Sequence, residues 1–364
     1  MLVLGMMSGT SLDGIDLALL DTDGEEKITT GASVFFAYQP SDRDILRAAL
    51  LCADGLPTDI LTSRAAWPTP LIAAETLITQ RHFEAARDFL SQEKRQPQLI
   101  GFHGQTLTHR PDEAMTLQIG DGAALAAQLN IDVIGDFRSA DMRAGGQGAP
   151  LVPLFHAALI GPLEAPLGVV NLGGIANVTY LETDGAILAF DTGPANALLD
   201  DWMVQNTDHA YDANGALAAQ GQVDEAALAA LMQHDYFAKA PPKSLDRLDF
   251  DLAPVAHLSA ADGAATLTAF SAQALAAGLA QCPQQPSRLI LCGGGRHNAS
   301  LCQHISRVSG CAVVLCDDLG WAGDALEAQA FAWLAARSLR GLPLSLPQTT
   351  GARQPVTGGI LFKA

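Results

Sequence analysis

The chain has 364 residues, 49% of them hydrophobic, and its 39 acidic and 21 basic residues give a formal net charge of −18 at pH 7. This length suits two domains, and the acidic excess argues against a nucleic-acid partner. No apolar run approaches the length that crosses a bilayer, so we expect no membrane partner.

The first residues and the cysteines indicate a cytoplasmic protein. The start MLVLG has neither the positive region nor the cleavage site of a signal peptide. The six cysteines form no CxxC pair, and several stand in apolar surroundings. We therefore expect reduced thiols, with a zinc site as the alternative.

The first half of the chain alternates predicted strands with helices. Residues 2–5 and IDLALLDTDG predict two strands on either side of a small polar turn, and ASVFFAYQP predicts a third. The Ala- and Leu-rich stretch from Asp42 to Gln92 has helical spacing. PQLIGFHGQTLTHR predicts a buried strand that ends in a glycine turn, and MTLQIGDGAALAAQLNIDVIGDFR predicts strand, helix, strand.

The second half begins again in the same manner. GVVNLGGIANVTYLETDG and LVLGMMSGTSLDGIDLALLDTDG are both strand, polar turn and strand, and both close on TDG, which indicates an internal repeat. A helix over Ala195–Gln233, strands in RLILCGGG and CAVVLCDDLG, a helix in DALEAQAFAWL and a last strand in GGILFKA follow. The predicted class is α/β with two similar lobes.

We place the N-terminal lobe at residues 1–135 and the C-terminal lobe at residues 136–364. No Pro- or Ser-rich linker separates them, so this boundary is soft and lies near Gly135–Pro153. The C-terminal tail is free to return to the first lobe.

The opening motif GMMSGTSLDGID has the composition of a phosphate-binding turn. A tight turn of Gly, Ser and Thr aims several backbone N–H groups at one point, which suits an anion in a chain with few basic side chains. Asp13 and Asp16 then suit a divalent cation such as Mg²⁺ that accompanies a nucleotide. No Gly-Lys-Ser/Thr follows, so this is not a Walker loop. The alternative is a plain hairpin turn with exposed carboxylates.

Three more turns of this kind, NLGGIANVT, FDTGPANALLD and LCGGGRHN, each follow an apolar strand. One such turn can be a flexible loop, but four favour ATP gripped between the two lobes. The residues that we predict to bind ATP are Gly9, Thr10, Ser11, Leu12, Asp13, Gly14, Ile15, Asp16, Asn171, Gly173, Gly174, Gly193, Gly293, Gly294, Gly295 and Asn298.

Asp191 is the candidate catalytic base. It follows the apolar strand AILAF, so we expect it at the carboxyl end of that strand, facing the interlobe cleft. A partly desolvated carboxylate there can take a proton from a hydroxyl or from water. The alternative is an N-cap of the helix that follows, and the two roles are compatible.

Five residues are candidates to bind the substrate. HGQT contains His103 and Gln105, and GDFRSADMRAGGQGAP is dense in Asp, Arg and Gly. Arg138 could pair with a ligand carboxylate, and Asp141 could accept hydrogen bonds from sugar hydroxyls. Glu327 stands in an apolar helix, where a solvated carboxylate is unusual. The alternatives are a structural histidine and ordinary loop charges.

These motifs, together with GGQGAPLVP and EAQAFAWLA, resemble the anhydro-N-acetylmuramic acid kinases in order from Met1 to about Leu334. The resemblance implies an actin/hexokinase-type ATPase fold with duplicated lobes and the active site between them. It implies that ATP and water open the 1,6-anhydro ring of the amino sugar to give N-acetylmuramic acid 6-phosphate during cell-wall recycling. The family's base falls on Asp191 and its ATP loop on residues 9–16, and a homodimer is implied.

Two other functions stay open at this point. A conventional amino-sugar kinase of the same fold would use Asp191 on a hydroxyl group. A nucleotide-binding regulator would bind ATP without turnover that a sugar accelerates. The segment PPKSLDRLDF resembles a loop of the family, but the sequence assigns it no role.

Overall fold

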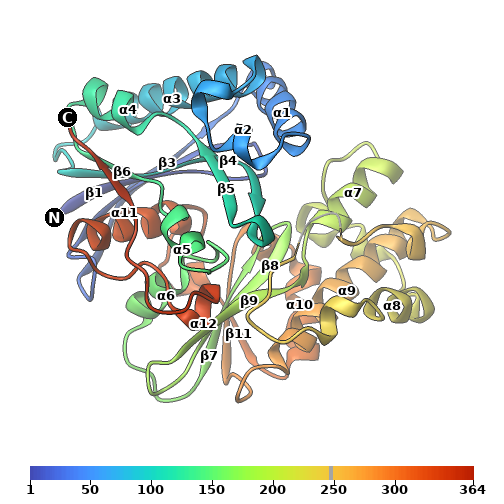
Figure 1. Ribbon diagram of the computed structural model, residues 1–364. Helices are drawn as coiled ribbons and strands as arrows, with labels where there is room; N and C mark the ends of the chain where they lie inside the picture. The colour runs from blue at the N-terminus through green and yellow to red at the C-terminus, as the bar shows by residue number, and fades with distance from the viewer. Residues whose placement is uncertain (246–248) are drawn as a thin grey trace. The chain divides into compact units, whose positions relative to one another are not determined.

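The computed structural model describes residues 1–245 and 249–364, which divide into two compact units (Figure 1). The first unit comprises residues 1–161 and 325–364, and the second comprises residues 162–324. This division differs from the predicted boundary after residue 135. Residues 136–161 belong to the first unit because α5 (Ser139–Arg143) contacts β5 and α6 (Pro153–Ile160) contacts α11.

A seven-stranded sheet forms the centre of the first unit. Its order is β12-β6-β4-β1-β2-β3, with β5 paired to β4. The strand β2 is antiparallel to β1 and β3, whereas β4 is parallel to β1 and β6. The strands are β1 (Leu2–Ser8), β2 (Gly14–Thr22), β3 (Ile28–Ala37), β4 (Leu99–Arg110), β5 (Met115–Ile119), β6 (Val133–Gly135) and β12 (Ile360–Phe362).

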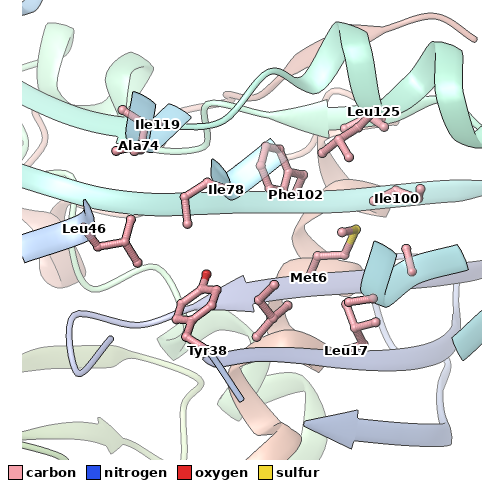
Figure 2. Packing of buried hydrophobic residues seen from close by; sticks show 14 of the residues in the cluster. Met6, Leu17, Tyr38, Leu46, Ala74, Ile78, Ile100, Phe102, Ile119 and Leu125 are labelled. Atoms are coloured by element: carbon pink, nitrogen blue, oxygen red, sulfur yellow. The ribbon is translucent and has the colours of Figure 1, made fainter. Parts of the chain in front are cut away.

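Helices cover this sheet and close its core. Figure 2 shows Leu46, Ile78 and Leu125 from three of these helices among Met6 and Phe102 of the sheet. These side chains are buried, and β1 itself is buried at every position, as expected for a continuous apolar run that is covered on both faces. The helices of the first unit, besides α5 and α6, are α1 (Pro40–Asp54), α2 (Thr58–Leu61), α3 (Thr69–Leu90), α4 (Gly122–Leu129), α11 (Leu326–Leu339) and α12 (Pro347–Thr350).

Two glycines on neighbouring strands let α11 approach the sheet closely. Gly5 of β1 pairs with Gly101 of β4 in the parallel register. A Cβ at Gly5 would overlap the carbonyl oxygen of Ala328, and a Cβ at Gly101 would overlap that of Phe331. Glycine in a strand interior weakens the strand, so its use here reflects this backbone contact.

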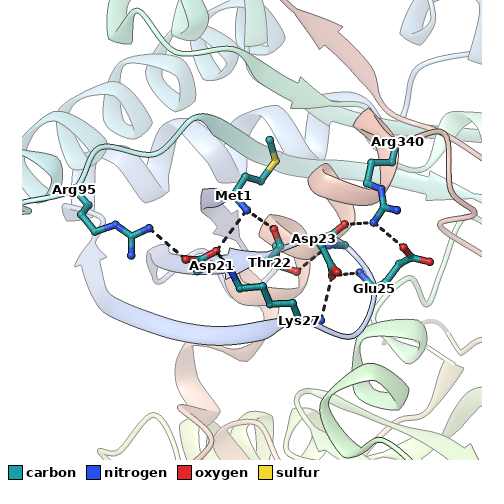
Figure 3. A network of polar contacts seen from close by, with 9 residues as sticks. Met1, Asp21, Thr22, Asp23, Glu25, Lys27, Arg95 and Arg340 are labelled. Atoms are coloured by element: carbon teal, nitrogen blue, oxygen red, sulfur yellow. Dashed lines mark hydrogen bonds and ion pairs between the residues drawn. The ribbon is translucent and has the colours of Figure 1, made fainter.

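A polar network ties the end of α11 to the turn between β2 and β3 (Figure 3). The guanidinium of Arg340 donates to the carbonyl oxygen of Asp23 at 2.6 Å and pairs with Glu25 at 2.7 Å. Lys27 and Arg95 contact Asp21 and lower the pKa of that carboxyl group to about 2. These groups are largely exposed, so we expect each pair to add little stability.

The second unit repeats the sheet of the first. Its order is β11-β10-β7-β8-β9, with β8 antiparallel to β7 and β9, and β10 parallel to β7 and β11. In the first unit, the strands β6-β4-β1-β2-β3 correspond one by one to these five strands, in the same order and with the same parallel and antiparallel pairings. The predicted α/β class with duplicated lobes is confirmed. The strands are β7 (Leu167–Leu172), β8 (Ile175–Leu181), β9 (Ile187–Pro194), β10 (Arg288–Cys292) and β11 (Ala312–Leu315).

The helices of the second unit differ in part from the prediction. The single helix expected over Ala195–Gln233 is two helices, α7 (Ala197–Asn206) and α8 (Glu225–Met232), separated by irregular chain and short 3₁₀ turns. The sequence analysis did not identify α9 (Ala260–Leu279), which is buried on most sides. The last helix of the second unit is α10 (Ala299–Ser309). Within the described part of the chain, no helix combines the length and apolarity needed to span a bilayer.

The glycine contact under α11 gives a stability prediction. We expect Gly5→Ala to lower the free energy of unfolding by about 3 kcal/mol, because the new methyl group must displace helix backbone. The matched control is Gly55→Ala, where the nearest atom to the new Cβ lies 3.9 Å away and φ is −83°. Denaturant unfolding measures both variants, and equal stability of the two would contradict the close approach.

Candidate active site

The predicted phosphate-binding turn is a compact turn between β1 and β2. The N–H of Leu12 donates to the carbonyl oxygen of Gly9 at 3.3 Å, and the hydroxyl of Ser11 donates to Asp13 Oδ1 at 2.7 Å. Leu12 has a φ of 55°, in the left-handed region that a tight turn requires. Thr10, Ser11 and Asp13 are exposed and can meet a ligand.

Two of the residues predicted to bind ATP in this turn have buried side chains. Leu12 and Ile15 belong to the hydrophobic core of the first unit, with 6% and 2% of their surface exposed. Their side chains anchor the turn to the sheet, so only their backbone groups remain available to a nucleotide. The glycines at positions 9 and 14 differ, since a Cβ would fit at Gly9 but would overlap the carbonyl oxygen of Phe36 at Gly14.

Gln105 supports the turn from the neighbouring strand β4. Its Nε2 donates to the carbonyl oxygen of Gly9 at 3.0 Å, and the hydroxyl of Ser8 donates to the carbonyl oxygen of Gly104 at 3.2 Å. Gln105 is fully buried, and its Oε1 accepts no hydrogen bond from the residues that the structure describes. The structure thus places this predicted substrate residue against the predicted nucleotide turn.

His103, which is buried, and Arg138, which is half-buried, lie against each other in the first unit. Arg138 Nε and Nη2 lie 3.1 and 2.9 Å from His103 Nε2, and Nη1 donates to the carbonyl oxygen of Gly148 at 2.8 Å. Burial, and secondly the charge of Arg138, keep the pKa of His103 well below its usual value. The neutral ring therefore accepts at Nε2 and donates from Nδ1 to the carbonyl oxygen of Gly104, at 2.8 Å.

Glu327 faces the same part of the first unit from the first turn of α11. Its side chain is solvent-accessible, yet desolvation by the surrounding protein raises its pKa. The charge of Asp13 adds to this shift, and the charge of Arg138 opposes it. Glu327 therefore lies within electrostatic reach of both Arg138 and Asp13.

Asp141, a predicted substrate residue, is held by donors within the first unit. Its carboxylate is buried and accepts from the N–H of Gly148 at 2.7 Å, the hydroxyl of Thr350 at 2.7 Å and the hydroxyl of Ser345. These bonds tie the loop after α5 to the chain near α12. Asp141 therefore has a structural role, and its contact with sugar hydroxyls remains a prediction.

Asp191 lies in the second unit, near the end of β9 at an irregularity of the sheet. Asn177 pairs with Asp191 whereas Ala176 pairs with Gly193, so Thr192 is an extra residue of the kind found in β-bulges next to active sites. The side chain is half-buried, and desolvation raises its pKa to about 7. A carboxyl group with this pKa can accept a proton at neutral pH.

A segment to which the sequence analysis assigned no role holds this carboxylate in place. The N–H of Leu245 donates to Asp191 Oδ2 at 2.9 Å, and the N–H of Asp191 donates to the carbonyl oxygen of Lys243 at 2.9 Å. The hydroxyl of Tyr236 donates to the carbonyl oxygen of Asp191 at 2.5 Å. Residues 246–248 of the PPKSLDRLDF segment lie outside the described residues.

The glycine turns of the second unit come together. Asn196 Nδ2 donates to the carbonyl oxygens of Leu172 and Gly173 at 2.9 and 2.7 Å, which fixes the turn between β7 and β8. A Cβ at Gly295 would lie 2.7 Å from the Cβ of Leu172, and a Cβ at Gly293 would overlap Asn171 Oδ1. The triple glycine therefore packs against this turn, with open space beside Gly294.

Gly193 and Asn298 have local structural roles. A Cβ at Gly193 would lie 2.6 Å from the Cβ of Ala274 on α9. Asn298 is the N-cap of α10 and accepts from the N–H of Leu301 at 2.9 Å. Their contact with ATP remains a prediction.

Arg296, which follows the triple glycine, was not among the predicted site residues. This buried guanidinium donates to the carbonyl oxygen of Gly293 at 3.0 Å and pairs with Asp317 and Asp324, each at 2.7 Å. Its position directly after three glycines, in GGGRHN, is the sequence feature that could have identified it. Across residues 1–245 and 249–364, no group of three or more His, Cys, Asp or Glu side chains could hold a metal ion.

Comparison with known proteins places this chain in a family. The family model described as anhydro-N-acetylmuramic acid kinase matches residues 1–364. A relative of that name from Rhizorhabdus wittichii is 51% identical over 368 residues, which cover 100% of this chain and 99% of the relative. Another of that name from Rhodospirillum rubrum is 50% identical over 361 residues, which cover 99% of this chain and 94% of the relative.

Among solved structures, the activator of the 2-hydroxyisocaproyl-CoA dehydratase from Clostridium difficile with bound ADPNP aligns with a TM-score of 0.46 and 13% identity. The alignment covers 93% of this chain and 96% of that one. The match along all 364 residues and the identity to full-length relatives show that the chain belongs to the anhydro-N-acetylmuramic acid kinase family.

Proposed function

We propose that the chain is an ATP-dependent kinase that opens the 1,6-anhydro ring of 1,6-anhydro-N-acetylmuramic acid with water and phosphorylates the 6-oxygen. The products are N-acetylmuramic acid 6-phosphate and ADP. Family membership along the whole chain supports the substrate. The observation that carries the chemistry is the half-buried carboxyl group of Asp191, whose pKa is raised to about 7.

In the proposed reaction, Asp191 takes a proton from water. The 6-oxygen of the anhydro sugar is bonded to the anomeric carbon and carries no proton, so no base is needed at that oxygen. The water oxygen forms a bond to the anomeric carbon as the bond from this carbon to the 6-oxygen breaks. The 6-oxygen takes the γ-phosphoryl group, and ADP leaves.

Backbone N–H groups hold the phosphates of ATP in this proposal. The exposed turn at residues 9–13 in the first unit and the glycine turns of the second unit supply them. A net charge of −18 makes such neutral donors suitable, since basic side chains are few. Phosphoryl transfer depends mainly on positioning and electrostatic stabilisation, which these turns provide.

The acidic residues near the opening turn fit Mg²⁺. The charge of Asp13 raises the pKa of Glu327, so these carboxylates repel each other when no cation is present. Magnesium bound with a nucleotide takes most of its ligands from phosphates and water and only one or two from carboxylates. When bound, it neutralises charge on the phosphates.

For the sugar, we propose contacts with His103, Arg138 and Glu327. The guanidinium of Arg138 suits the lactyl carboxylate of the sugar, and its fixed bonds to His103 and Gly148 hold it in one orientation. The Oε1 of Gln105, which accepts no hydrogen bond from residues 1–245 and 249–364, offers an acceptor next to the opening turn. A cytoplasmic homodimer that acts in peptidoglycan recycling completes the proposal, and equilibrium sedimentation tests the dimer.

The assay that tests this function measures ADP release with Mg²⁺, ATP and either sugar. We expect turnover with 1,6-anhydro-N-acetylmuramic acid and none with N-acetylmuramic acid. Asp191→Asn should lower kcat by about 10²–10⁴-fold, the range for loss of a general base. Equal turnover with N-acetylmuramic acid would show that the chain is a conventional sugar kinase. A fully active Asp191→Asn variant would show that Asp191 is not the catalytic base.

The raised pKa of Asp191 also predicts how stability depends on pH. Between pH 3.8 and about 7 the folded chain keeps this proton while the unfolded chain has lost it, so stability falls as pH rises through this window. Asp191→Asn has no such loss. We expect its free energy of unfolding to exceed that of the wild type by about 1–3 kcal/mol at pH 8, less than the full shift implies because the group is partly exposed.

Denaturant unfolding of both proteins at pH 4.5 and pH 8 checks this result. The difference between them should be small at the lower pH. A difference that does not change between the two pH values would show that Asp191 has an ordinary pKa.

The opening turn gives a separate prediction about nucleotide binding. Gly9→Val should raise the KM for ATP at least tenfold and leave the KM for the sugar within twofold, because the side chain fills space meant for phosphate. The fold should tolerate the change, since the nearest atom to a new Cβ is Ser11 Oγ at 3.6 Å. Steady-state kinetics measure both KM values. An equal rise in the KM for ATP and the KM for the sugar would contradict a phosphate-binding role of this turn.

A further inference from the structure

The backbone of Asp191 is held on both sides by one segment, residues 236–245. The hydroxyl of Tyr236 donates to the carbonyl oxygen of Asp191 at 2.5 Å, and the carbonyl oxygen of Lys243 accepts from its N–H at 2.9 Å. The N–H of Leu245 donates to the carboxylate at 2.9 Å. Of these three bonds, only the one from Tyr236 is made by a side chain and can be removed by substitution.

Lys243 closes this set of contacts. Its Nζ donates to the carbonyl oxygen of Tyr236 at 3.2 Å and lies 4.6 Å from the centroid of the Tyr236 ring. Lys243 has only 6% of its surface exposed, and no carboxylate of residues 1–245 and 249–364 forms an ion pair with it. Burying an ammonium group is costly, so its contacts with Tyr236 are its main compensation within this part of the chain.

We propose that Tyr236 and Lys243 are positioning residues for the catalytic base: Lys243 fixes the ring of Tyr236, whose hydroxyl fixes the backbone of Asp191. The inference rests on the role of Asp191 proposed above. Neither side chain touches the reacting atoms. Both act through the orientation of one carboxylate at a bulge, where the regular sheet bonds that would otherwise fix the backbone are interrupted.

The chemistry explains why such support matters. A base must stand within hydrogen-bond distance of the proton that it takes, and a shift of about 1 Å can cost about 100-fold in rate. The cation over the ring also draws electron density from the phenol, which makes its hydroxyl a stronger donor. Tyr236 itself is buried, with 1% of its surface exposed, so its ring has one packed position.

Tyr236→Phe and Lys243→Met test the inference in the full-length protein. We expect each to lower kcat about tenfold with anhydro-N-acetylmuramic acid and ATP, with the KM of either substrate within twofold. The control is Tyr180→Phe, which removes another buried hydroxyl of the second unit, bonded to Glu182 at 2.6 Å. The control should keep its kcat within twofold.

A double-mutant cycle separates positioning from a general structural effect. In an Asp191→Asn background, Tyr236→Phe should cause no further loss of the residual rate, because there is no carboxylate left to orient. A tenfold loss in both backgrounds would overturn the inference, as would an unchanged kcat in Tyr236→Phe and Lys243→Met. If Asp191→Asn alone keeps full activity, the role of Asp191 as the base is contradicted. This result differs from those that contradict only the positioning role of Tyr236 and Lys243.

Thermal unfolding completes the test. The same loss of kcat in variants that melt within a few degrees of the wild type would support positioning. A loss of kcat that Lys243→Arg does not recover even in part, together with a large fall in melting temperature, would instead assign Lys243 to stability and overturn its positioning role.

Discussion

The proposed chemistry depends on one carboxyl group that the protein keeps from full contact with water. Asp191 stands at a bulge near the end of β9, and the N–H of Leu245 occupies its Oδ2. Within residues 1–245 and 249–364, Oδ1 accepts no hydrogen bond that would compete with a water molecule. Desolvation raises the pKa of the group to about 7, while the single bond from Leu245 opposes this shift only in part. The environment therefore favours a base rather than a permanently charged structural aspartate.

The two sheets provide the frame for this chemistry by repeating one arrangement. In each, three antiparallel strands are followed by parallel ones, and the first hairpin carries a polar turn. The turns differ in how they are fixed. Gln105 holds the turn of the first unit, whereas Asn196 and the packed glycines hold that of the second. Duplication thus explains the shared positions of the turns, and different neighbouring side chains allow them different roles.

The sequence predicted the features that have a local pattern. Short apolar runs, with alternation in the second strand, located the strands, and glycine turns after strands located the turn regions of both units. Burial could not be predicted at single positions: Leu12, Ile15 and Asp141 are enclosed by residues distant in sequence. The contacts of Tyr236 and Lys243 with Asp191 span 45 and 52 residues of chain, and no periodicity reports such pairs. The helix α9 was missed because it is buried on most sides and so lacks a clear polar face.

The central claim is that water attacks the anomeric carbon while the 6-oxygen takes the phosphoryl group. The most direct measurement is a single-turnover reaction of anhydro-N-acetylmuramic acid and ATP in oxygen-18 water, analysed by mass spectrometry of the product. The proposed mechanism predicts one labelled oxygen per sugar, at the anomeric position, appearing faster than the product exchanges with water, and no label in the phosphate group. Label in the phosphate group, or none at the anomeric position beyond exchange, would contradict it.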